Sequence, residues 1–198
     1  MSAHTAALIL AGGFSRRMGQ DKALVAWRNQ PLWRHVWARL KAQRPQAAEQ
    51  IWINTRTPSA DYEQAIASGD LHGCVHDPET FAGLGPLAGM CAGLRHIDCD
   101  QLLVVPCDTP KLPLDVLARL SACQAPIAIA ATRSAQGLRA HPTIALLRRR
   151  ALLGIEQQLQ RGELKLMHWL TANAHAQVVW DHDDGFVNVN DAAALQAL

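Results

Sequence analysis

Two short, almost wholly apolar segments most restrict how this chain folds. Residues Ala6–Leu10 are AALIL and lead into a glycine-rich turn, and Gln101–Pro106 are QLLVVP. Strands that are apolar on both faces are typical of parallel sheets covered by helices on either side. The two segments therefore predict an α/β protein with a buried, largely parallel sheet.

The rest of the chain alternates strand and helix patterns, as βαβ units require. No repeat or linker interrupts them, so we expect residues 1–198 to form a single domain. In such sheets, ligands bind at the carboxyl ends of the strands. Further strands are expected at Gln50–Asn54, Leu71–His76, Ile127–Ala131, Thr143–Leu147 and Gln177–Trp180, and helices at Pro31–Gln43, Ala60–Ala67, Pro86–His96, Pro113–Ala122, Arg148–Gln160, Leu164–Thr171 and from Asp191.

Composition narrows the class of protein further. Of 198 residues, 49% are hydrophobic and 18% charged, with a formal net charge of +2, which excludes a disordered chain and argues against a nucleic-acid-coating surface. There is no apolar run long enough to span a bilayer, and no basic residue precedes the apolar run Ala6–Ala11, as it would in a signal peptide. The five cysteines form no Cys-x-x-Cys pair, so a disulfide scaffold or zinc ribbon is not expected. We expect a cytoplasmic protein that binds neither membranes nor nucleic acids.

The segment Leu10–Lys22 follows the first strand directly and indicates a phosphate-binding loop. The adjacent Gly12 and Gly13 let backbone N–H groups approach a phosphate without a Cβ in the way. Arg17 and Lys22 add two positive charges. The spacing matches neither the Walker A nor the dinucleotide glycine pattern.

A second candidate site closes the most hydrophobic strand, at Val105–Pro110. Asp108 lies at the end of that strand, where a carboxylate beside a phosphate loop can ligate Mg²⁺ together with substrate oxygens. The alternative is that Asp108 caps a following helix. Cys107 has no adjacent base and is interpreted as a small buried residue.

Polar or small residues also follow other strands. Asn54 and Asp77 end the second and third strands, where they are either turn residues or contacts to a base or ribose. The segment Gly83–Gly89 opens a helix whose N-terminus can face an anion, unless its small residues serve only close packing.

Near the C-terminus, Asn188 and Asn190 alternate with apolar residues, and on a strand they would point to the same side. They could hold a polar substrate or belong to a capped strand end. His141 is either a catalytic base or a hydrogen-bonded structural histidine, and the second interpretation is the simpler one. The cluster Asp181–Asp184 could hold a metal, but a solvated turn is the stronger interpretation.

Together these motifs resemble the molybdenum cofactor guanylyltransferases, a family of nucleotidyltransferases. The resemblance rests on Leu10–Lys22, Gly85–Gly89, the Pro-Cys-Asp-Thr-Pro segment, His141–Leu146 and Phe186–Asn190, and it covers nearly the whole chain. It implies a Rossmann-like three-layer α/β/α nucleotide-binding fold with a mostly parallel central sheet. It also implies Mg²⁺-dependent transfer of GMP from GTP to the terminal phosphate of molybdenum-molybdopterin, with release of pyrophosphate.

The resemblance assigns roles residue by residue. It implies nucleotide binding by one set of residues, a molybdopterin site built from another, and Mg²⁺ on Asp108, with Lys22, Arg17 and Asp108 as the catalytic groups. Partners would include molybdenum-insertion proteins and the target molybdoenzymes. The nucleotide set is Leu10, Ala11, Gly12, Gly13, Lys22, Asn54, Asp77 and Asp108, and the molybdopterin set is Gly85, Gly89, Asn188 and Asn190.

One departure and three alternatives stay open at this point. Asn29 stands where the family usually has glycine, and asparagine tolerates a positive φ well enough to keep the turn. The alternatives are a cytidylyltransferase acting on the same cofactor, a sugar-nucleotide pyrophosphorylase, and a non-catalytic nucleotide-binding adaptor that docks on molybdoenzymes. The Gly12-Gly13 pair favours the purine nucleotide over CTP, and the presence of both Lys22 and Asp108 argues against the adaptor.

Overall fold

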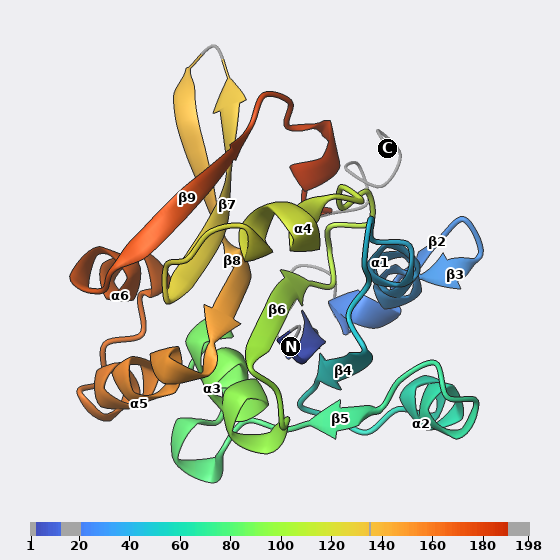
Figure 1. Cartoon of the computed structure of the whole chain (residues 1–198). Helices are drawn as coiled ribbons and strands as arrows, with labels where there is room; N and C mark the ends of the chain where they lie inside the picture. Colours follow the sequence, from blue (N-terminus) through green and yellow to red (C-terminus); the bar gives the residue numbers. More distant parts are fainter. Residues whose placement is uncertain (1–2, 13–20, 135, 190–198) are drawn as a thin grey trace.

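A computed structural model describes residues 3–12, 21–134 and 136–189 of the chain (Figure 1). At its centre lies a seven-stranded sheet with the order β5-β4-β1-β6-β8-β7-β9. The strands are β1 (Thr5–Leu10), β4 (Gln50–Asn54), β5 (Gly73–Val75), β6 (Gln101–Pro106), β7 (Ile127–Ser134), β8 (Gly137–Arg148) and β9 (His175–Trp180).

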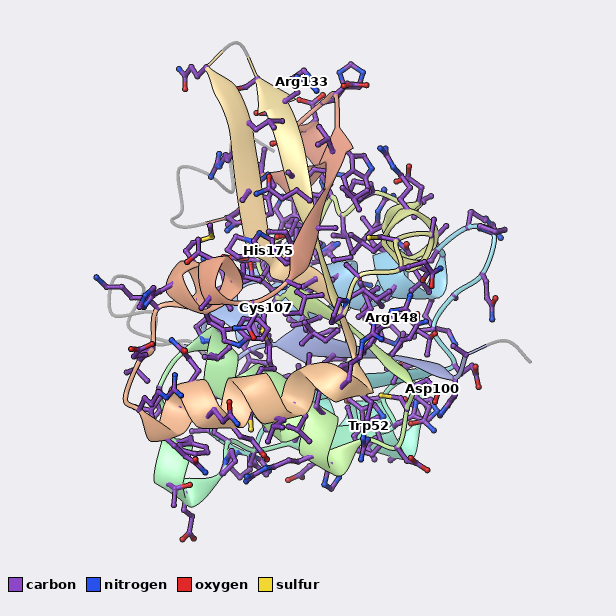
Figure 2. The ribbon with its side chains drawn as sticks, turned by 60° about the vertical axis from the view of Figure 1, so that its left-hand side comes forward. Trp52, Asp100, Cys107, Arg133, Arg148 and His175 are labelled. Atoms are coloured by element: carbon purple, nitrogen blue, oxygen red, sulfur yellow. The ribbon has the colours of Figure 1, made fainter. Side chains whose placement is uncertain are left out.

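The sheet is mostly parallel, as the sequence predicts. Strands β5, β4, β1 and β6 run parallel to one another, and β9 runs parallel to β7. Strand β8 is the exception, since it pairs antiparallel with both β6 and β7. β7 and β8 form a long hairpin that projects from the body of the molecule, with Arg133 close to its tip (Figures 1 and 2).

Helices cover both faces of the sheet and give the expected three layers. α1 (Leu32–Lys41), α2 (Ala60–Ala67) and α4 (Val116–Ser121) bury apolar side chains against one face. α3 (Pro86–His96), α5 (Leu152–Gln160) and α6 (Leu166–Ala172) do so against the other. Short 3₁₀ segments are η1 (Lys22–Leu24), η2 (Glu79–Phe81), η3 (Arg149–Ala151) and η4 (Asp184–Phe186).

The two faces of β1 show why the strand is apolar throughout. Ala7 and Ile9 belong to the core under α1, α2 and α4, whereas Ala6 and Leu8 belong to the core under α3, α5 and α6. All four side chains are fully buried. A strand between two helical layers has no solvent-exposed face, so the strand pattern shows no polar alternation.

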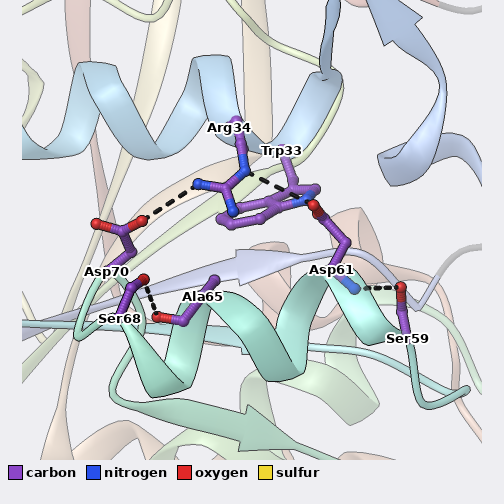
Figure 3. Close-up of polar contacts among 7 residues, drawn as sticks. All are labelled: Trp33, Arg34, Ser59, Asp61, Ala65, Ser68 and Asp70. Carbon is purple, nitrogen blue, oxygen red and sulfur yellow. Dashed lines mark hydrogen bonds and ion pairs between the residues drawn. The ribbon is translucent and has the colours of Figure 1, made fainter.

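Polar contacts fasten α1 to α2 on one face (Figure 3). The indole Nε1 of Trp33, a fully buried residue, donates to Asp61 Oδ2 at 2.5 Å, and the Arg34 guanidinium lies 3.7 Å from Asp61 and 3.2 Å from Asp70. The Ser59 hydroxyl caps α2 by accepting from the Asp61 amide. These contacts hold the two helices side by side over the strands that lead to the site.

A small hairpin, β2 (Ala26–Trp27) and β3 (Gln30–Pro31), precedes α1. Both turn residues have a positive φ, 48° at Arg28 and 64° at Asn29, as a two-residue hairpin turn of type I′ requires. The expectation that asparagine preserves this turn is confirmed.

No helix among the described residues is long and apolar enough to cross a membrane.

Candidate active site

The strand ends that carry the predicted site residues meet at one edge of the sheet. Leu10, the last residue of β1, is in register with Asn54 of β4 on one side and with Pro106 of β6 on the other. Asn54 is in turn opposite Val75 of β5. The sequences after β1, β4, β5 and β6 therefore leave the sheet together, and Asp77 and Asp108 each lie two residues beyond a strand end.

An ion pair joins the segments that follow β1 and β6, the two segments that the sequence singles out for phosphate chemistry. Lys22 Nζ lies 2.5 Å from Asp108 Oδ2, and the two side chains are only 17% and 12% exposed. Lys22 begins η1, whose first turn is capped by the Asp21 carboxylate accepting from the Ala23 amide. Burial raises the pKa of Asp21. The Lys22–Asp108 ion pair thus holds the start of η1 against the end of β6.

The second carboxylate oxygen of Asp108 is the unusual atom of the site. Oδ1 is buried and, within the described part of the chain, has no hydrogen-bond partner. Leaving a buried carboxylate oxygen without a partner costs free energy unless a ligand or ion satisfies it. The neighbouring Cys107, labelled in Figure 2, is buried, and burial raises the pKa of its thiol, so it stays protonated and is not a nucleophile.

Asn54 organises the part of the edge formed by β4 and β5. The residue is 3% exposed, and its Nδ2 donates to Val75 O at 3.2 Å and to Asp77 Oδ1 at 3.0 Å. Asp77 Oδ2 accepts from the Gly83 amide at 3.3 Å. The predicted nucleotide residues Asn54 and Asp77 therefore touch each other, and Asn54 orients the Asp77 carboxylate from below.

Two of the predicted glycines pack directly on Asn54. A Cβ on Gly89 would lie 2.5 Å from Asn54 Oδ1, and one on Gly12 would lie 3.2 Å from the same atom. Gly89 is buried inside α3, so in this structure it brings the helix close to the strand ends. Gly85, with φ 85°, is the residue from which α3 begins, and a Cβ there would meet no atom within 4 Å.

Arg56 is a residue of this edge that the sequence analysis overlooked. It follows Asn54 by two positions and is exposed. Its Cγ lies 3.4 Å from the position a Gly12 Cβ would take, and its Nη1 lies 2.9 Å from that of a Gly83 Cβ. A basic residue two positions after a strand end, matching the placement of Asp77 and Asp108, was the available signal.

The C-terminal motif reaches the same site from the far side of the sheet. Asn188 Oδ1 accepts from Thr109 Oγ1 at 3.1 Å, and the Val189 amide donates to Asp108 O at 2.9 Å. In Figure 1 the segment after β9 crosses to the loop between β6 and α4. Residues 187–189 are not in a strand, so the interpretation that Asn188 lies on one is wrong. The Val189 backbone pairs with the loop after β6 instead of with a neighbouring strand.

His141 supports this motif. It is 7% exposed, stacks on Phe186 with ring centroids 4.9 Å apart, and makes a 2.9 Å hydrogen bond between its Nε2 and Thr132 Oγ1. Burial, and secondarily Arg139, lower its pKa, so the imidazole is neutral near pH 7. These contacts fit the structural interpretation of His141.

Three predicted site residues lie outside the described part of the chain, and the acidic cluster Asp181–Asp184 lies within it. Gly13, Arg17 and Asn190 lie outside the described residues. Within residues 3–12, 21–134 and 136–189, no group of three or more His, Cys, Asp or Glu side chains could hold a metal ion. The acidic cluster Asp181–Asp184 follows β9 and leads into η4, so no strand comes directly after it.

A mostly parallel sheet with Gly12, a lysine and a carboxylate at its carboxyl edge is typical of a nucleotide-binding α/β protein of the nucleotidyltransferase type. Comparison with known families agrees with this class. Residues 7–178 match the model of the MobA-like NTP transferase domain, and the chain belongs to that family.

Curated relatives agree with this family, and solved structures share its fold. Proteins named molybdenum cofactor guanylyltransferase are 35% identical in Shewanella pealeana, over 100% of this chain and 95% of the relative, and 36% identical in Shewanella frigidimarina, over 97% and 94%. The Archaeoglobus fulgidus molybdopterin-guanine dinucleotide biosynthesis protein A superposes with a TM-score of 0.72 at 20% identity, covering 98% of this chain and 95% of that one. A CMP:2-keto-3-deoxy-manno-octonic acid synthetase solved with CTP has a TM-score of 0.70 at 14% identity, over 98% and 95%. The two structures share the fold.

Proposed function

We propose that this protein is a molybdenum cofactor guanylyltransferase. It transfers GMP from GTP to the terminal phosphate of molybdenum-molybdopterin. A phosphate oxygen of the cofactor forms a bond to the α-phosphorus of GTP, the bond from that phosphorus to the β-phosphate oxygen breaks, and pyrophosphate leaves. The observation that carries the proposal is the Lys22–Asp108 pair at the end of β6, in a chain whose full-length relatives bear this name.

The chemistry asks little of general acids or bases, because the attacking phosphate is already ionised. What the site must supply is positioning and positive charge around the α-phosphate and the departing pyrophosphate. Lys22 supplies one charge at the end of β6, and Arg17 would supply a second. The Ala11 N–H donates to Asn54 O at 2.8 Å, so the backbone N–H groups of Gly12 and Gly13 would face the phosphates of the same nucleotide.

Asp108 fits the ligand set expected for Mg²⁺. Magnesium prefers one or two carboxylates together with substrate phosphate oxygens, and Asp108 offers a buried Oδ1 without a partner in the described chain. When bound, the ion would neutralise charge on the phosphate oxygens. Asp108 would hold it, and Lys22 would keep the opposite carboxylate oxygen oriented.

The two substrates would occupy different parts of the edge. Residues of the N-terminal half, Gly12, Lys22, Asp77 and Asp108, would bind GTP. Asn188 and Asn190, with Gly85 and Gly89, would form the molybdopterin side. An in-line transfer needs the two phosphates to approach from opposite sides of one α-phosphate, and the C-terminal motif reaches Asp108 from the side opposite β4 and β5.

The cellular setting follows from this role. We propose that the chain is a single nucleotidyltransferase domain working in the cytoplasm, and that it exchanges cofactor with molybdenum-insertion proteins and target molybdoenzymes.

The test is transfer of label from α-³²P-GTP to molybdenum-molybdopterin, with CTP and a sugar 1-phosphate as competing substrates. Appearance of a labelled guanine dinucleotide supports the proposal. Transfer from CTP, transfer to the sugar phosphate, or nucleotide binding without turnover would each contradict it and favour a cytidylyltransferase, a pyrophosphorylase or an adaptor. In binding titrations, Lys22→Ala should weaken GTP and spare molybdopterin, whereas Asn188→Ala should do the reverse.

A further inference from the structure

The backbone next to Arg56 is fixed by hydrogen bonds of the neighbouring Thr55. The preceding Thr55 is 1% exposed, and its amide donates to Val75 O at 3.1 Å. Its carbonyl oxygen pairs with His76 Nδ1 at 2.8 Å, and its hydroxyl donates to Thr57 O at 2.9 Å. Only the side chain of Arg56 therefore remains adjustable, and it extends across Gly12 toward Gly83.

The Arg56 and Asp77 side chains approach the same residue, Gly83. The Gly83 amide donates to Asp77 Oδ2, while the Arg56 guanidinium occupies the space where a Gly83 side chain would stand. A carboxylate has about four acceptor positions, and in the described chain Asp77 uses one oxygen for Asn54 and the other for Gly83. We call the part of the edge formed by Arg56, Asp77 and Gly83 the rim. It combines the remaining acceptor capacity of the Asp77 carboxylate with the N–H donors of the Arg56 guanidinium.

The spacing of the strands decides which part of a nucleotide reaches this rim. Neighbouring strands lie about 4.8 Å apart, and the order β5-β4-β1-β6 puts β4 two strands and β5 three strands from β6. The rim is thus roughly 10–14 Å from the Asp108 end. With the α-phosphate at Asp108, a ribose and a purine ring together cover that span. The base therefore reaches the Arg56 guanidinium near Gly83, whereas the phosphates lie toward Gly12.

Guanine has the pattern that such a rim complements. Its N1–H and 2-amino groups donate, and its O6 and N7 accept and form the usual bidentate contact with arginine. Resting on the proposed function, we infer that Arg56 is a specificity residue that reads O6 and N7 of the guanine of GTP. Cytosine presents an amino donor where guanine presents O6, so the same guanidinium would disfavour CTP.

The experiment titrates GTP, 7-deaza-GTP and ITP into the wild-type protein and into Arg56→Ala, without the cofactor substrate. 7-Deaza-GTP lacks the N7 acceptor, and ITP lacks the 2-amino group. The wild type should bind GTP roughly tenfold more tightly than 7-deaza-GTP, within the range of bidentate arginine–guanine contacts. In Arg56→Ala that ratio should fall to about one, while the GTP-to-ITP ratio stays as in the wild type.

Two further variants guard the interpretation. Arg56→Lys keeps the charge but loses the bidentate geometry, so it too should lose the GTP-to-7-deaza-GTP ratio. Arg161→Ala removes an exposed arginine at the end of α5 and should leave every ratio unchanged.

Equal weakening of all three nucleotides in Arg56→Ala, with their ratios intact, would mean that Arg56 contacts the triphosphate and would overturn the inference. So would a wild type that does not distinguish GTP from 7-deaza-GTP. Because binding needs no turnover, these results are separable from the proposed function. A protein that shows the predicted ratios but transfers no GMP would refute the function and leave the Arg56 assignment standing.

Discussion

Substitution of Gly89 by alanine tests whether the tight packing around Asn54 holds the site together. The new Cβ would lie 2.5 Å from Asn54 Oδ1, 3.0 Å from Asn54 Cγ and 2.8 Å from Leu10 Cδ2. Distances below 3.0 Å force a neighbour to move. Asn54 resists, because its amide is buried and holds hydrogen bonds to Val75 and Asp77.

The expected cost combines three terms. Alanine favours a helix over glycine by about 1 kcal/mol, which opposes the effect. Overpacking costs about 1–3 kcal/mol, and each hydrogen bond lost if Asn54 turns away costs about 1 kcal/mol. The free energy of unfolding of Gly89→Ala should therefore fall by roughly 2 kcal/mol. Displacement of Asp77 should weaken GTP binding as well.

Urea unfolding measures the stability change, and Gly154→Ala is the matched control. Gly154 also lies inside a helix, α5, but its Cβ would approach only Asn173 Oδ1 at 3.0 Å, with the next atom 3.7 Å away. This variant should stay within about 1 kcal/mol of the wild type. If Gly89→Ala were as stable as Gly154→Ala, the close approach of α3 to Asn54 would not be the constraint inferred here.

Three more outcomes follow from the structure. Asp108→Ala should reduce GMP transfer more than tenfold, a barrier increase above ~1.4 kcal/mol, and a smaller loss measured by steady-state kinetics would exclude Asp108 as the essential ligand. His141 has a lowered pKa, so below pH 6.5 the unfolded chain binds more protons than the folded chain. As the pH falls through 6.5, the free energy of unfolding should therefore decrease more for the wild type than for His141→Gln. Urea unfolding that shows the same pH dependence for both proteins would contradict this. Asp61→Ala removes the acceptor of the buried Trp33 indole, and chemical unfolding should show a loss of about 1–3 kcal/mol, whereas an unchanged midpoint would mean that the contact adds nothing.

Much of this architecture follows from local sequence. Two strands and two helices are predicted with the bounds observed, because the spacing of apolar residues that marks a strand or a helix is a local property of the sequence. They are Gln50–Asn54, Gln101–Pro106, Ala60–Ala67 and Pro86–His96. The carboxyl ends of parallel strands share an edge, so the placement of Asn54, Asp77 and Asp108 along one edge of the sheet could also be anticipated.

Tertiary structure alone decided the rest, because those features depend on pairs distant in the chain. The antiparallel insertion of β8 beside β6 joins segments whose patterns resemble those of the parallel strands, and periodicity reports burial but not direction. The Lys22–Asp108 contact spans 86 residues and the contact of Thr109 with Asn188 spans 79. Arg56 is one exposed arginine among many in the sequence, and it gains a role only where folding lays it across Gly12 and Gly83.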